Sequence, residues 1–215
     1  MIKNRTVQLI YQTVYCTIGL IAIIASFGFF DMKFNENFYV YFTNWSNYLC
    51  FLVMLVELVH TIKKKEDSYV SSLHLLKFIG LLSIFLTFLV FNFFLANDAM
   101  RDPALNYKIN SISFHIILPI MYILDWFLFY KKNTTKWIYP IYSVCFPIIY
   151  IFFIYLRASW LLNFISSDDV NSFLLYPYFF LNIEKLGFSM VVKWCIMLAI
   201  SFVAIGFIFV WCITF

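Results

Sequence analysis

Polar side chains that could carry out chemistry interrupt two apolar stretches of the chain. The first interruption is residues 41–47 (YFTNWSN), which bring hydroxyl, amide and phenol groups to the start of an apolar run. If this segment is helical, Thr43, Ser46 and Asn47 share one face, because side chains at i, i+3 and i+4 lie above one another. The second interruption is His115, in the stretch SFHIILP. Polar groups inside a bilayer are costly unless they face protein or a ligand, so both are candidate functional sites.

Thr43 and His115 have the residue types of a nucleophile and its base. A threonine hydroxyl attacks a carbonyl only if a base removes its proton and hydrogen-bond donors receive the oxyanion. Candidate donors are Tyr41, Ser46, Asn47 and backbone amides. The alternatives are that Thr43 only caps the start of a helix, and that His115 is a structural histidine.

Glu57 and Asp125 are acids inside apolar stretches, each about one turn from the stretch's end. In the structural interpretation they pair with His60, Lys131 or Lys132 and so hold helices in place. In the functional interpretation they belong to a proton or cation path. Asp125 cannot orient His115, because ten residues of helix separate the two by about 15 Å.

The composition identifies an integral membrane protein. The 215 residues are 64% hydrophobic and 12% charged, and 28 of them are phenylalanine. Soluble domains have about 45–50% apolar and about 25% charged residues. The net charge of +4 does not indicate nucleic-acid binding, because the basic residues lie in short segments between apolar runs. The five cysteines show no CxxC or His/Cys spacing, so we expect no disulfide framework, metal site or cofactor.

Six stretches are long and apolar enough to span a bilayer as helices, which predicts a single all-α transmembrane domain over residues 1–215. They are about 7–30, 41–61, 77–97, 111–130, 137–156 and 189–214. The first is too long for a signal peptide, so we expect a retained helix. Pro119 predicts a bend in the fourth helix, and Pro140 and Pro147 predict one in the fifth.

The lysines of the connections predict the orientation. Lys3, Arg5, Lys63–Lys65, Lys77, Lys131, Lys132 and Lys136 cluster at the N-terminus and in the second and fourth connections. The positive-inside rule therefore places both termini in the cytoplasm. Thr43 and His115 then lie at similar depths, roughly 3–8 Å below the outer ends of their helices. His60 and His74 fall at the opposite side, too far from His115 to share a metal or haem with it.

The fifth connection, about 157–188, is the one long loop and carries the aromatic sequence YPYFFL at 176–181. Aromatic residues favour the membrane interface, so we expect this loop to cover the outer side, with Tyr178 available to a substrate. Arg157 at its start either holds a substrate carboxylate or extends its side chain to the interface.

At these residues the chain resembles the androgen-induced family of multi-pass membrane proteins and its bacterial six-helix relatives. YFTNWSN is similar to the family segment with the nucleophilic threonine, HIILP followed by LDW to the segment with the catalytic histidine, and YPYFFL to a stretch before the last helix. Human members are threonine hydrolases of fatty acid esters of hydroxy fatty acids. The resemblance implies Thr43 as nucleophile, His115 as base, membrane lipids and a fatty acyl ester as partners, and location in a bacterial plasma membrane.

Three hypotheses follow. The first is an intramembrane hydrolase of lipid esters that uses Thr43 and His115. The second is a transporter that uses Glu57 and Asp125. The third is a non-catalytic lipid-binding membrane protein in which Thr43 merely caps a helix.

Overall fold

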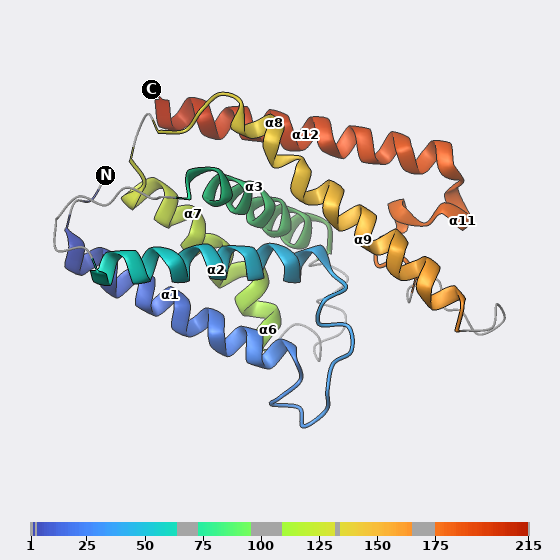
Figure 1. The fold of residues 1–215 in the computed structure, drawn as a ribbon, viewed down its shortest axis with the longest axis horizontal. Coiled ribbons are helices and arrows are strands. Elements are labelled where there is room, and N and C mark those ends of the chain that lie inside the picture. The colour runs from blue at the N-terminus through green and yellow to red at the C-terminus, as the bar shows by residue number, and fades with distance from the viewer. Residues whose placement is uncertain are drawn as a thin grey trace.

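The computed structural model describes residues 2, 4–63, 73–95, 109–131, 134–164 and 175–214, and every regular element among them is helical. Among these residues, three long uninterrupted helices (α1, α2 and α12) and three composite ones (α3 with η1, α6 with η2 and α7, and α8 with α9) are connected as shown in Figure 1. In chain order the elements are α1 Arg5–Ser26, α2 Phe42–Lys63, α3 His74–Val90, the π-helical η1 Phe91–Leu95, α6 Ile109–Ile112, the π-helical η2 Ser113–Ile117, α7 Leu118–Phe129, α8 Tyr139–Ser143, α9 Cys145–Leu162, the 3-10 helix η3 Phe179–Leu181, α11 Ile183–Leu186 and α12 Phe188–Thr214.

The predicted architecture, an all-α polytopic membrane bundle, is confirmed. Five helices are long and apolar enough to cross a membrane, namely Arg5–Ser26, Phe42–Lys63, His74–Phe93, Tyr139–Leu162 and Phe188–Ile213. The fourth predicted stretch forms a shorter apolar helix, Ser113–Phe129. Both ends of the chain lie at the same end of the bundle (Figure 1), as an even number of antiparallel helices requires. Lys3, Lys64, Lys65 and Lys132, which entered the predicted orientation, lie outside the described residues.

Two predicted boundaries are wrong for identifiable reasons. The first helix ends at Ser26 rather than near residue 30, because Gly28 has φ 85° and its carbonyl accepts a hydrogen bond from the Lys33 amide in a tight turn. The fifth helix continues to Leu162 rather than ending near 156, so Arg157 lies on α9 and not in the loop. The prolines act as predicted: Val144 separates α8 from α9, and η2 directly precedes the turn that contains Pro119.

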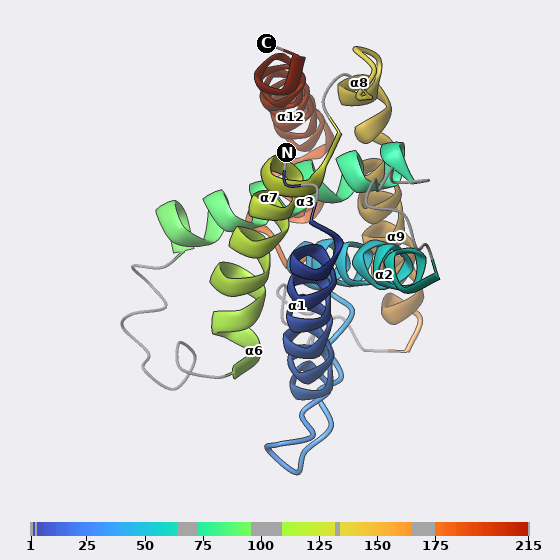
Figure 2. The ribbon, with the colours of Figure 1, turned by 90° about the vertical axis from the view of Figure 1, so that its left-hand side faces the viewer.

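α3 is the central helix of the bundle. Half of its apolar window is buried, a larger share than in the other four candidate spans. Figure 2, seen from the end where both termini lie, shows α3 running across the other helices, with α1, α2 and α7 on one side and α12 on the other. Its backbone approaches α2 and α7 closely at Gly80, where a Cβ would lie 2.8 Å from Tyr122 Oη and 3.1 Å from Cys50 Sγ. Close approach at small residues is how membrane helices gain packing contacts.

The buried apolar side chains form two clusters. The larger one joins α1, α2, α3, α7 and α12 and includes Tyr15, Met54, Phe78 and Trp126. The smaller one joins the start of α2 to α9 and the 175–181 segment, and it includes Phe42, Tyr150 and Leu181. The second cluster attaches the YPYFFL segment to the helix that carries Thr43.

Candidate active site in an apolar cavity

Thr43 lies in the first turn of α2, which begins at Phe42, and it is half-buried. A cavity of about 600 Å³ lies beside it, enclosed by the start of α2, the end of α3, α9, the 178–183 segment and α12. Its wall is aliphatic and aromatic apart from a few hydroxyls, a thiol and peptide groups. The volume is within the range of about 300–1,000 Å³ that is typical of small-molecule sites. Thr43 therefore lines a space suited to an apolar ligand.

Tyr178 holds the start of α2 from outside the helix. The backbone amide of Phe42 donates to the Tyr178 hydroxyl at 3.1 Å, so this phenol satisfies one of the amides that a helix start leaves without a partner. Burial raises the pKa of Tyr178 to about 12, while hydrogen bonds with Phe42 and Thr43 act in the opposite direction. The phenol is therefore neutral near pH 7 and keeps its O–H as a donor beside Thr43.

The side-chain hydrogen-bond donors of Ser46 and Asn47 bond to groups inside the bundle. The Ser46 hydroxyl lies 2.9 Å from the Thr43 carbonyl and 2.9 Å from the Thr87 hydroxyl. The Asn47 side-chain amide donates both to the Thr43 carbonyl at 2.8 Å and to the Phe114 carbonyl at 3.0 Å. Both side chains are almost fully buried. They fix the first turn of α2, and their predicted role as oxyanion donors stays a prediction.

His115 lies in η2, and its ring is held on two sides. Its Nδ1 lies 2.8 Å from the Ser111 carbonyl, which can only accept, so Nδ1 carries the proton and Nε2 has the free lone pair. The imidazole stacks on Phe91, with ring centroids 3.7 Å apart and planes at 14°. Asn92, next to Phe91, donates to the His115 carbonyl at 3.2 Å. The two π-helical segments, η1 and η2, therefore position His115 together.

Thr43 and His115 lie on neighbouring segments at one level of the bundle, because Asn47 bonds the carbonyl of Thr43 and that of Phe114, the residue before His115. They do not share the cavity wall. Thr43 and Phe91 line the cavity, whereas His115 does not and its ring stacks on Phe91. The predicted base therefore does not line the cavity that the predicted nucleophile lines.

Two other predicted contacts lie at the edges of this site. Tyr41 is 45% exposed, and its ring centroid lies 6.4 Å from that of Tyr178. The Arg157 guanidinium lies 5.8 Å from the centre of the Tyr39 ring, a cation–π arrangement at the surface of α9. Both predicted roles of Arg157, holding a substrate carboxylate or extending to the interface, stay predictions.

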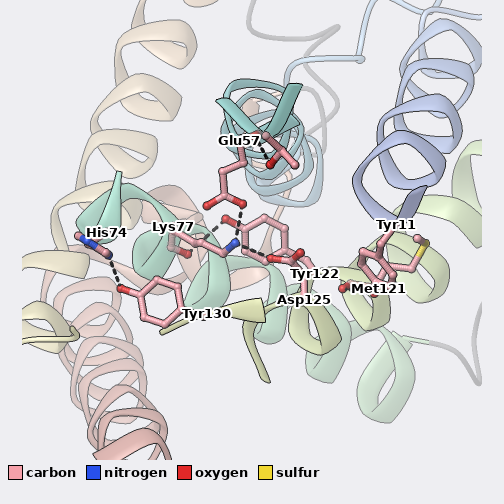
Figure 3. A network of polar contacts seen from close by, with 9 residues as sticks. Tyr11, Glu57, His74, Lys77, Met121, Tyr122, Asp125 and Tyr130 are labelled. Atoms are coloured by element: carbon pink, nitrogen blue, oxygen red, sulfur yellow. Dashed lines mark hydrogen bonds and ion pairs between the residues drawn. The ribbon is translucent and has the colours of Figure 1, made fainter. Parts of the chain in front are cut away.

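Glu57 and Asp125 lie at the other end of the bundle and meet at Lys77 (Figure 3). The Lys77 Nζ is 2.5 Å from Glu57 Oε2 and also pairs with Asp125 Oδ2. All three side chains are at most 1% exposed. The predicted pairing with His60 or Lys131 is therefore wrong, and Lys132 lies outside the described residues. The sequence analysis assigned Lys77 to a connection, but α3 begins at His74 and carries Lys77 into the bundle.

Phe91, Asn92 and Lys77 were missed as site residues by the sequence analysis. Asn92 was expected only as a hydrogen-bonding group between helices, which agrees with its bond to the His115 carbonyl. Lys77 is a polar residue next to an apolar stretch, and that signal was available. Nothing in the sequence distinguishes Phe91 from the other phenylalanines, of which the chain has 28 in all. Its role becomes visible only in the structure, where the His115 ring stacks on it.

The fold and the two polar sites define a multi-pass all-α membrane protein with an apolar cavity at one end and a buried ion triad at the other. Comparisons with protein-family models, with curated proteins and with solved structures found no match to this chain. The resemblance to the androgen-induced family therefore stays a prediction.

Proposed function

We propose that this chain is an intramembrane hydrolase of lipid esters in a bacterial plasma membrane, with Thr43 as nucleophile and His115 as base. The observation that carries the proposal is that Thr43 lines an otherwise largely apolar cavity of about 600 Å³. An acyl chain would occupy the space between α9 and α12, and its ester carbonyl would lie at Thr43. Because lipid tails are as apolar as this cavity wall, an acyl chain can move into it from the bilayer without losing an apolar environment.

The reaction would proceed through an acyl-enzyme. Thr43 Oγ1 attacks the ester carbon and its proton passes to His115 Nε2, which then returns the proton to the leaving alcohol. Water hydrolyses the acyl-threonine with the same histidine as base. The neutral Tyr178 phenol, which hydrogen-bonds at Phe42 and Thr43, would donate to the oxyanion. Rotation of Phe91 out of the stack would let the imidazole reach the cavity.

The test is labelling of the purified protein with a fluorophosphonate probe that carries an alkyl chain. Thr43→Ala removes the attacking oxygen and should abolish labelling. Thr87→Ala is the matched control, because this second threonine lines the same cavity. Similarly, His115→Ala should reduce labelling about 10²-fold or more, whereas His60→Ala should leave it unchanged. Labelling of Thr43→Ala at the wild-type rate would overturn the proposal.

A second candidate is a non-catalytic lipid-binding protein. The observation that favours it is that His115 stacks on Phe91 and does not line the cavity that Thr43 lines. The two candidates differ in the lipid that copurifies with the protein. A hydrolase with Thr43→Ala should retain intact ester where the wild type retains the free acid. A binding protein should retain the same lipid in both forms.

A further inference from the structure

The buried triad of Glu57, Lys77 and Asp125 carries two acids and one base. Glu57 comes from α2, Lys77 from α3 and Asp125 from α7, so the group joins three helices (Figure 3). Among the described residues, Lys77 is the one ion-pair partner of both acids. With every group ionised, the triad would have one uncompensated negative charge in a site that is at most 1% exposed. An unpaired buried charge is among the most costly features of a protein interior.

Each acid also keeps one oxygen without a hydrogen bond. Glu57 Oε1 and Asp125 Oδ1 are fully buried and have no partner among the residues that the structure describes. Lys77 cannot satisfy both, because its ammonium already bonds the other oxygen of each carboxyl and lies 5.9 Å from the centre of the Tyr130 ring. The side chain of Gln12, on the buried face of α1, is likewise fully buried and unpartnered among these residues.

The surrounding titratable groups do not supply the missing positive charge. They are Tyr11, Tyr15 and Cys16 on α1, Cys50 on α2, His74 on α3, Tyr122 on α7 and Tyr130 at its end. Phenols and thiols are neutral near pH 7, since their ordinary pKa values are about 8.5–10. His74, the one histidine among them, is half-exposed and bonds the Tyr130 hydroxyl at 2.8 Å through Nδ1.

We propose that the Glu57–Lys77–Asp125 triad is a binding site for one exchangeable proton. The resting state contains the lysine ammonium, one carboxylate and one carboxylic acid, which together are neutral. The proton on the acid replaces the missing cation, and two carboxyl groups that share a site hold such a proton because both cannot be ionised at once. The half-exposed His74 and the Tyr130 hydroxyl mark the side from which the proton exchanges with water.

Infrared spectroscopy of the full-length protein at neutral pH tests this site directly. A protonated carboxyl gives a carbonyl stretching band, separate from the carboxylate bands, that shifts when H₂O is exchanged for D₂O. The wild type should show one such band. Glu57→Gln and Asp125→Asn should each abolish it, because either variant leaves one lysine and one carboxylate, a neutral pair that needs no proton.

Two further variants sharpen the result. Lys77→Met leaves two acids without a cation, so the band should persist at about twice the intensity. Glu36→Gln, an exposed acid in the first loop, is the matched control and should leave the band unchanged. If Lys77→Met does not fold, Glu57→Gln and Asp125→Asn are enough for the test, because each variant keeps one carboxylate paired with Lys77.

Two outcomes would overturn the proposal. One is a wild-type protein without the band, and the other is a band that survives in both Glu57→Gln and Asp125→Asn. If the band is missing and wild-type thermal stability rises with Na⁺ at constant ionic strength, the site binds a monovalent cation instead of a proton.

Discussion

The two ends of the bundle differ in how closely their side chains are packed. At the end near the termini, three helices close around Glu57, Lys77 and Asp125, and almost no surface of these side chains is exposed. At the other end, α9 and α12 leave a cavity of about 600 Å³ beside Thr43. Packed ionic groups stabilise one arrangement of helices, whereas a largely apolar cavity leaves room for a ligand. The comparison separates a tightly packed ionic end, where three helices share one triad, from an end whose apolar cavity could hold a ligand.

The largest effect should come from removing the charge at the centre of the triad. Lys77→Met leaves two buried acids without their partner, and such a loss costs about 3–5 kcal/mol. Thermal unfolding in detergent should show a strongly lowered Tm, whereas Lys193→Met on exposed α12 should leave it near the wild-type value. If Lys77→Met unfolds like the wild type, the triad does not stabilise the bundle and the proposed difference between the two ends fails.

A smaller loss of stability should follow from Gly80→Ala. The added Cβ would lie 2.8 Å from Tyr122 Oη and 3.1 Å from Cys50 Sγ, so the buried Tyr122 and Cys50 side chains would have to shift. Overpacking of this kind costs about 1–3 kcal/mol. The measurement is again the Tm, with probe labelling of Thr43 as a second readout that should stay unchanged.

Adding Tyr122→Phe to Gly80→Ala tests whether the contact with the Tyr122 hydroxyl causes the loss of stability. The substitution removes the atom that lies nearest to the added Cβ. The double variant should then be less destabilised than the sum of the two single variants. Strict additivity would show that the clash with the Tyr122 hydroxyl is not the reason.

The smallest change in stability, with a clear change in activity, is expected for Tyr178→Phe. The ring stays but the Phe42 amide loses its partner, which costs about 0.5–2 kcal/mol, as for other lost helix caps. Labelling should fall about 10²-fold if the phenol donates to the oxyanion. Tyr176→Phe in the same segment is the control. Equal labelling of both variants would remove Tyr178 from the reaction while leaving its role as a cap.

The sequence analysis predicted much of the fold, and its errors share a cause. Long apolar runs predict membrane helices because a backbone in lipid must satisfy its own hydrogen bonds. Helix ends depend on local contacts, so the turn at Gly28 and the extension of α9 past Arg157 were missed. The candidate site was predicted in part: Thr43 and His115 belong to neighbouring segments, but only Thr43 lines the cavity, and His115 stacks on Phe91.

The amino-acid sequence alone determined that this protein is a multi-pass helical membrane protein, because hydropathy and length are properties of each segment by itself. It also indicated which polar residues must find partners inside the bundle, since each is costly there. Only the tertiary structure decided which residues are the partners of these polar side chains. Lys77 meets Glu57 and Asp125, Tyr178 meets the start of α2, and Phe91 meets His115, because each contact joins helices whose relative rotation no single segment encodes.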